Sequence, residues 1–102
     1  MIHLCVYVPI SHVDKVKAAL FAAGAGRIGD YDCCAWQTDG LGQFRPLEGS
    51  GPFLGNKNQT ESVREVKLEM VCEQKLWSQV VQALKNAHPY ETPAYFGVPV
   101  LS

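Results

Sequence analysis

Two segments far apart in the chain alternate strictly between apolar and mixed side chains. Successive side chains of a strand point to opposite faces, so each segment predicts a strand that buries one face only. The apolar positions are Ile2, Leu4, Val6 and Val8 in the first segment and Val66, Leu68, Met70 and Cys72 in the second. Two half-buried strands of this kind require a sheet that is covered on one side, and this restricts the fold more than any other feature.

A helical pattern follows each of these strands. Apolar residues recur at three- and four-residue intervals in residues 11–23 and again in residues 76–87, which predicts two amphipathic helices. Ser11 is placed to cap the first helix, and Gly24 to end it in the left-handed conformation. Because a residue before proline disfavours helical geometry, His88-Pro89 predicts the end of the second helix near residue 87.

The remaining segments predict two further strands and one long loop. Residues 31–38 favour a strand closed by a turn at Asp39-Gly40, and residues 42–46 favour a short returning strand. Residues 47–59 carry several glycines and a proline, which predicts an irregular loop of a length that usually serves a function. Residues 94–101 favour a final strand at a sheet edge, because Gly97 and Pro99 interrupt them.

The order strand, helix, strand, strand, helix, strand predicts an α+β fold of the ferredoxin-like (split βαβ) type, as a single domain over residues 1–102. Its antiparallel sheet would carry both helices on one face. The other face would be bare, and its mixed character favours self-association into a closed homo-oligomer. The residues predicted on that bare face are His3, Cys5, Tyr7, Lys67, Glu69 and Val71.

Composition argues against several partners and locations. The net charge is -1 and charged residues make up 19% of the 102 residues, so no strong positive field would attract nucleic acid. No apolar run approaches the roughly 20 residues of a membrane span, and no leader is evident, so we expect a cytoplasmic protein without membrane contact. The four cysteines lack CxxC spacing and predict reduced thiols. Cys33-Cys34, in a strand, would point to opposite faces and could not chelate one ion together.

The densest polar cluster is residues 88–93, His-Pro-Tyr-Glu-Thr-Pro. His88 follows a helix C-terminus, whose negative dipole end favours the protonated imidazole, and Glu91 is close enough in sequence to pair with it. One interpretation is structural, with both side chains satisfying backbone groups or an intersubunit contact. A second is that His88 and Glu91 bind a divalent metal ion or a small anion. The third is catalysis, with His88 as general acid or base and Arg45 or Tyr90 of a neighbour completing the pocket.

The long loop offers a second candidate region. Arg45 beside Phe44 could bind an anion or a partner protein through its guanidinium, whereas a purely structural loop would bury Phe44 and Phe53 and leave Arg45 solvated. Residues 24–29 match GxGxxG, but they follow a helix and lead towards a strand. That is the reverse of a dinucleotide site, so we interpret them as a helix stop.

Several motifs resemble one known family. Residues 38–47 (TDGLGQFRPL), Gly49, residues 52–55 (PFLG) and residues 88–95 (HPYETPAY) are similar to the YqfO domain, the insert of the Nif-three-like (NGG-interacting-factor) dimetal proteins. The resemblance covers nearly the whole chain. It implies a PII-like and CutA-like fold, and such folds usually form trimers. The family's dinuclear metal site lies in the flanking domain and has no counterparts here, so its hydrolase activity is not implied.

The sequence therefore favours a stand-alone PII-like homo-oligomeric binding or regulatory module, most simply a homotrimer, whose ligand the sequence does not identify. The alternative is a CutA-like metal-binding protein that uses His88 and Glu91, and the least favoured reading is a small enzyme with His88 as acid or base. No complete catalytic constellation is present. The predicted ligand-binding residues are Gly40, Gly42, Phe44, Arg45, His88, Tyr90 and Glu91.

Overall fold

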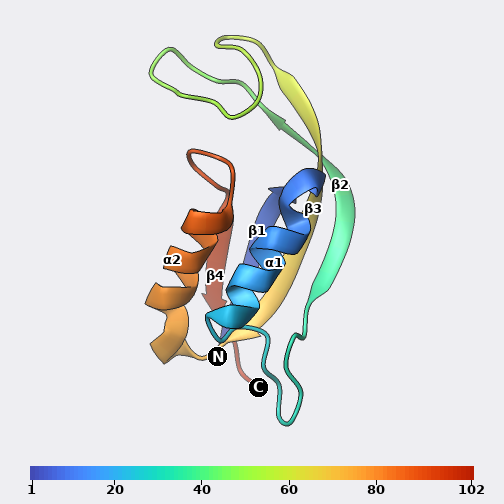
Figure 1. The fold of residues 1–102 in the computed structure, drawn as a ribbon, viewed down its shortest axis with the longest axis vertical. Helices are drawn as coiled ribbons and strands as arrows, with labels where there is room; N and C mark the ends of the chain where they lie inside the picture. The colour runs from blue at the N-terminus through green and yellow to red at the C-terminus, as the bar shows by residue number, and fades with distance from the viewer.

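The computed structural model describes all 102 residues and shows a four-stranded antiparallel sheet with two helices (Figure 1). The strands lie in the order β2-β3-β1-β4, so the predicted ferredoxin-like fold is confirmed. The elements in chain order are β1 (Ile2–Pro9), the 3-10 turn η1 (Ile10–His12), α1 (Val13–Ala22), β2 (Trp36–Phe44), β3 (Glu61–Cys72), the 3-10 turn η2 (Gln74–Leu76), α2 (Trp77–Ala87) and β4 (Tyr95–Pro99).

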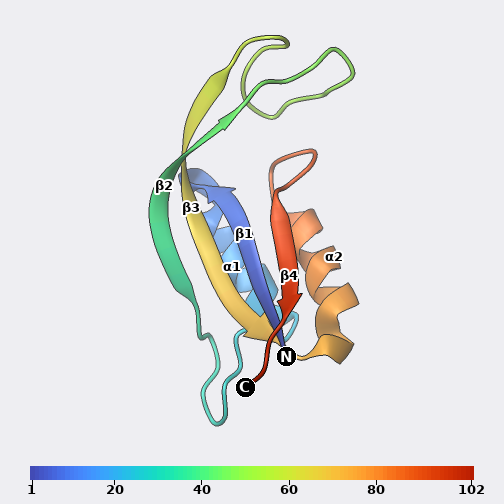
Figure 2. The same ribbon diagram turned by 180° about the vertical axis from the view of Figure 1, so that it is seen from behind.

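Both helices cover the same face of the sheet. Figure 1 shows α1 and α2 side by side in front of the strands, and Figure 2 shows the opposite face, which no helix covers. We call this second face the open face. Neither helix is long and apolar enough to cross a membrane.

The core lies between the helices and the sheet. The apolar positions predicted for the first and third strands are all buried there, which confirms the one-sided pattern of both segments. Their partners from the helices are Val13, Val16 and Leu20 of α1 and Val80, Leu84 and Ala87 of α2. At the edge of the core, Gly97 of β4 lies so close to the indole of Trp77 that even a Cβ atom would overlap the ring.

The second strand differs from the prediction. Asp39 and Gly40 do not form a turn, because they pair with Val66 and Glu65 inside the β2–β3 ladder. The strand runs on to Phe44, so the short returning strand predicted for residues 42–46 was also wrong. Residues 32–35, predicted as strand, lie outside every strand. Strand β3 is long enough to pair with the whole of β2, and the hydrogen bonds of this ladder outweigh the local turn preference of Asp-Gly.

Local details around α1 also differ. Ser11 does not cap the helix: the chain first makes η1, and the Ser11 Oγ lies 2.8 Å from Nδ1 of His12. Gly24 has φ +102°, as expected for the left-handed end of the helix. Cys33 has φ +54° and lies outside any strand. The prediction that the Cys33 and Cys34 thiols point to opposite faces assumed a strand, so it does not apply here.

Candidate ligand-binding pocket

The long loop and the turn after α2 meet at one end of the sheet. Residues 45–60 connect β2 to β3 and fold back towards residues 88–94, as the two loops at the top of Figure 1 show. The backbone N–H of Gly51 donates a hydrogen bond of 2.9 Å to Oε2 of Glu91, and the rings of Phe53 and Tyr90 lie 6.4 Å apart. Two segments separated by about forty residues of sequence are thereby held together.

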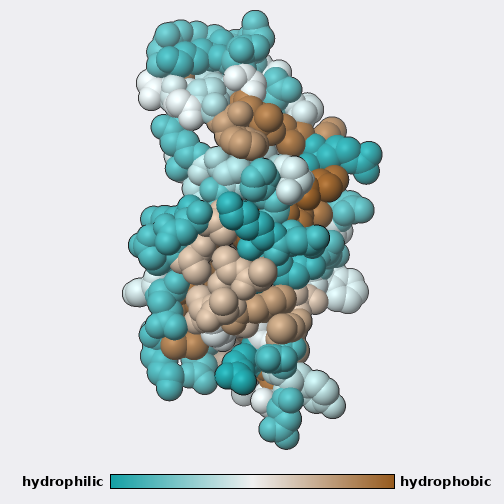
Figure 3. All heavy atoms as spheres, viewed as in Figure 1, coloured by the Kyte–Doolittle hydropathy of each residue, from teal (hydrophilic) through white to brown (hydrophobic).

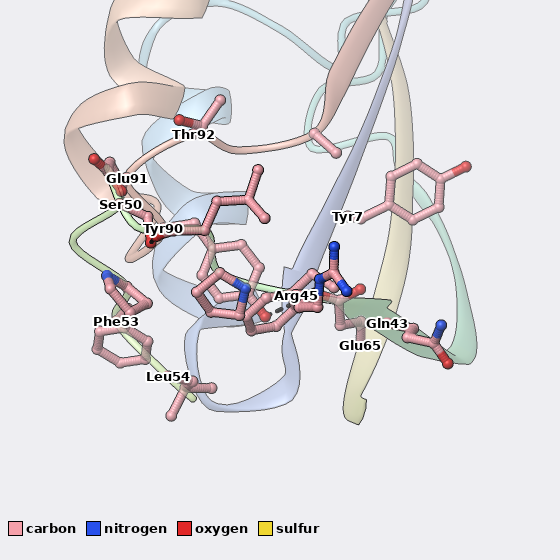
Figure 4. Close-up of a pocket in the computed structure, with 16 residues that line it drawn as sticks. Tyr7, Gln43, Arg45, Ser50, Phe53, Leu54, Glu65, Tyr90, Glu91 and Thr92 are labelled. Atoms are coloured by element: carbon pink, nitrogen blue, oxygen red, sulfur yellow. Dashed lines mark hydrogen bonds between the residues drawn. The ribbon is translucent and has the colours of Figure 1, made fainter. Parts of the chain in front are cut away.

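A pocket of about 460 Å³ lies between them. It is bounded by the end of β2, the loop and the turn, and its sheet side is formed by Tyr7 of β1 and Glu65 of β3 (Figure 4). This volume falls within the range of small-molecule sites in proteins. Apolar residues make much of its wall, among them Phe44, Leu47, Phe53 and Leu54.

Glu65 is the polar centre of the pocket. Its Oε2 accepts a hydrogen bond of 2.8 Å from the Tyr90 hydroxyl, and its Oε1 lies over Gly42, where any side chain on β2 would overlap the carboxylate. Gly40 is the direct ladder partner of Glu65. The absence of a side chain at Gly42 thus leaves room for Glu65 to lean across β2. Burial and the neighbouring carboxylate raise the pKa of the Tyr90 phenol above its usual value, so that the phenol remains a donor.

His88 lies beneath the pocket. Its Nδ1 accepts a hydrogen bond of 3.1 Å from the backbone N–H of Tyr90, and its Nε2 donates one of 2.7 Å to the carbonyl oxygen of Tyr7. The side chain is 6% exposed, and desolvation lowers its pKa below the usual value of 6.5. This direction runs against the expectation that the helix C-terminus favours a protonated His88, because desolvation disfavours the charged imidazole.

Metal binding and catalysis at His88 gain no support from this geometry. Both ring nitrogens are occupied inside the chain, and Glu91 bonds to Gly51 and not to His88. No three His, Cys, Asp or Glu side chains are grouped so that they could hold a metal ion. The metal site at His88 and Glu91 stays a prediction, as does an acid–base role, and both would need His88 to leave its hydrogen bonds.

The structure brings together most of the predicted ligand-binding residues. Gly42, Phe44, Arg45, Tyr90 and Glu91 all line the pocket. Gly40 lies farther along β2 and lines a neighbouring hollow on the open face, and His88 supports the pocket from below through Tyr90.

Sequence reasoning missed Tyr7 and Glu65 as pocket residues. Both were visible as polar positions on half-buried strands, and Glu65 directly precedes the run that begins at Val66. The signal that links Glu65 to the Gly-x-Gly motif is the β2–β3 register, and the turn wrongly predicted at Asp39-Gly40 obscured it.

Comparisons with known proteins agree with the fold. No family model matches the chain. A GTP cyclohydrolase 1 type 2 homolog from Bacillus subtilis is 45% identical over 97 residues, covering 95% of this chain and 26% of that protein. Its counterpart from Mycobacterium leprae is 46% identical over 90 residues, covering 88% and 23%. The chain thus spans about a quarter of the length of the curated relatives it matches.

Solved structures define the class. CutA1 from Pyrococcus horikoshii has a TM-score of 0.70 at 22% identity, and the match covers 98% of this chain and 83% of that one. The PII-like protein CutA from Nostoc has a TM-score of 0.69 at 17% identity, and the match covers 98% of this chain and 81% of that one. The domain therefore has the CutA-like and PII-like fold. A Bacillus cereus protein related to NIF3 reaches a TM-score of 0.83 at 38% identity, covering 97% of this chain and 25% of that one. With the sequence relatives, this places the chain in the Nif-three-like family, as a domain of the YqfO type.

The contact between Gly42 and Glu65 predicts different effects for the two glycines of β2. Gly42→Ala should push the Glu65 carboxylate away and break its hydrogen bond with Tyr90, so the pKa of the Tyr90 phenol should fall towards 10. Gly40→Ala is the matched control, because nothing lies within 4 Å of the added methyl group. Tyrosine absorbance titrated against pH measures the effect, and equal curves for both variants would contradict this account of Gly42.

Burial of His88 predicts a stability that falls in mild acid. The unfolded chain binds a proton at its histidine near pH 6.5, whereas folded His88 resists protonation, so stability should drop as pH falls below 6.5. The slope contributed is at most about 1.4 kcal/mol per pH unit, until the folded-state pKa is reached. Urea unfolding at pH 7.5 and at about pH 5.5 measures it. His88→Gln should lose this part of the slope and His12→Gln should keep it; an unchanged slope in His88→Gln contradicts the prediction.

Proposed function

We propose that this domain is a homo-oligomeric binding or regulatory module that binds a small molecule in the pocket between the long loop and the turn. The observation that carries the proposal is that these two segments, tied together by Gly51 and Glu91, enclose one pocket with Glu65 on its sheet side. A loop that served only to connect β2 and β3 would have no need to be tied to a turn forty residues away. We further propose that the protein works in the cytoplasm, in keeping with its four free cysteines.

The exposed apolar residues support a ligand in this place. Leu47, Phe53 and Leu54 are among the exposed large hydrophobic side chains of the chain, and all three line the pocket. Figure 3 shows strongly hydrophobic atoms gathered beneath the loop at the top of the molecule. Apolar surface that a folded chain leaves uncovered in a concave site is typical of ligand pockets.

The open face supports self-association. Trp36 of β2 is 71% exposed, and Phe96 and Val98 of β4 are 61% and 53% exposed. The ladder pairs Trp36 with Glu69, Phe96 with Cys5 and Val98 with His3, which places all three apolar side chains on the open face. Copies of this chain that cover the face would remove them from water. A homotrimer is the form that the CutA-like and PII-like resemblance favours.

Binding in the pocket is testable with the fluorescent probe anilinonaphthalene sulfonate, whose aromatic rings suit the apolar wall. Ala94 lines the pocket, so Ala94→Trp should fill it and weaken probe binding at least about tenfold. Ala18→Trp, on the exposed side of α1, is the control and should bind as the wild type does. Fluorescence titration measures both, and equal affinity in the two variants would place the probe elsewhere and count against the pocket.

Self-association is testable by light scattering. At micromolar concentration we expect three times the 11.2 kDa chain mass. Phe96→Glu should release smaller species, because it puts a charge into the covered face, whereas Ile28→Glu, at an exposed apolar site in the loop after α1, should not. A wild-type chain with the mass of a monomer would contradict the proposed oligomer. A Phe96→Glu variant with the same mass as the wild type would contradict the assignment of the open face as the interface.

A further inference from the structure

The pocket contains opposite charges that do not pair with each other. Arg45 and Glu65 both line it, and Figure 4 draws both among the side chains that bound it. The ion pairs of the chain join His3 and Lys67 to Glu69, and Lys75 to Glu73, so neither Arg45 nor Glu65 has an ionic partner. Tyr90 occupies only Oε2 of Glu65, and Oε1 has no hydrogen-bond partner in the chain. A cation and a carboxylate therefore both remain available to a ligand.

The wall around these charges is apolar and aromatic. The ring of Phe44 lies 5.9 Å from that of Tyr90, which in turn lies 6.4 Å from that of Phe53, so three rings form a continuous surface. Leu47 and Leu54 extend it along the loop. A ligand complementary to the whole pocket must present one negative group, one positive group and an apolar body.

Resting on the proposed function, we infer that the pocket binds a free α-amino acid with an apolar or aromatic side chain. Its carboxylate would accept hydrogen bonds from the Arg45 guanidinium, and its ammonium group would donate to Oε1 of Glu65. Its side chain would lie on the surface formed by Phe44, Phe53 and Leu47. The two headgroup contacts are charge-assisted, and they set the orientation of the ligand.

The same charges disfavour other classes of ligand. A simple anion attracted to Arg45 would meet the carboxylates of Glu65 and Glu91 in the same pocket. A simple cation would meet Arg45. A neutral apolar molecule would desolvate charged groups without replacing their bonds to water, which costs free energy. A zwitterion satisfies both signs at once, and the pocket has room for its side chain.

Titration calorimetry with L-phenylalanine and L-leucine tests the inference on the full chain. N-acetyl-phenylalanine lacks the positive charge and phenylalanine amide lacks the negative one, so each should bind at least about tenfold more weakly than phenylalanine. Glycine, which has both charges and no side chain, should also bind at least about tenfold more weakly. Either blocked analogue binding as tightly as phenylalanine would overturn the inference.

Variants test the two contacts separately. Arg45→Gln should weaken phenylalanine at least about tenfold, with Arg64→Gln as the control, because Arg64 is on the same hairpin and does not line the pocket. Glu65→Gln should weaken it similarly while keeping an acceptor for Tyr90, with Glu73→Gln as the control, because Glu73 is exposed and lines neither the pocket nor the neighbouring hollow. Loss of binding in the control variants as well would overturn the assignment of these contacts.

The probe from the preceding section separates two kinds of failure. Binding of anilinonaphthalene sulfonate that depends on Ala94, without binding of either amino acid, would overturn the ligand class and leave the pocket standing. Binding of neither probe nor amino acid would overturn both proposals. Amino-acid binding that survives Ala94→Trp would place the amino acid outside this pocket and overturn the inference.

Discussion

The antiparallel pairing of β3 with two neighbours is the constraint on which the rest of the structure depends. β2 pairs with residues 61–69 of β3, and β1 pairs with residues 65–72. The two ladders overlap only over residues 65–69. Glu65 is the last position with strands on both sides, opposite Pro9 of β1 and Gly40 of β2. Because proline supplies no ladder donor, β1 stops there, and the β2–β3 hairpin continues alone beyond the body of the sheet.

The pocket forms where the hairpin leaves the sheet. Tyr7 and Glu65 lie near the end of the β1–β3 ladder, the β2–β3 hairpin extends beyond them, and the turn after α2 forms another side of the pocket. One hydrogen bond from Gly51 and the ring contacts of Phe53 hold the loop in place. Few contacts secure this loop compared with the strands below it. Segments of that kind open at low free-energy cost, which suits a site that must admit a ligand.

The sequence predicts this fold well in the segments where apolar residues repeat with a fixed period. Alternation in β1 and β3 identified the buried and open faces, because every second side chain must enter the core. The local Asp39-Gly40 signal misled, since a turn preference is small compared with a ladder that continues past it. The β2–β3 register places Gly40 opposite Glu65. Local sequence patterns do not predict this pairing, because the two residues are far apart in the chain.

The candidate site was predictable in outline for a similar reason. The loop and the turn stood out because they are rich in residues that do not serve regular structure, and five of the seven predicted ligand-binding residues line the pocket. His88 misled because its sequence neighbours suggest a dipole that favours the proton, whereas burial in the folded chain lowers its pKa, and its Nε2 bonds to the carbonyl of Tyr7, eighty-one residues away. Burial and long-range hydrogen bonds are properties of the folded chain, and a single sequence reports them poorly.

Glu65 also connects the pocket to the open face. With Tyr7 and Gly42, it lines both the pocket and a neighbouring hollow of about 420 Å³ that continues along the open face to Lys67 and Glu69. A ligand that binds the Glu65 carboxylate, and copies that cover the open face, would therefore act on the same side chain from two directions. If covering the open face changes the ligand affinity of this pocket, the ligand must change self-association by the same factor, so the proposed ligand binding and the proposed self-association would be thermodynamically linked.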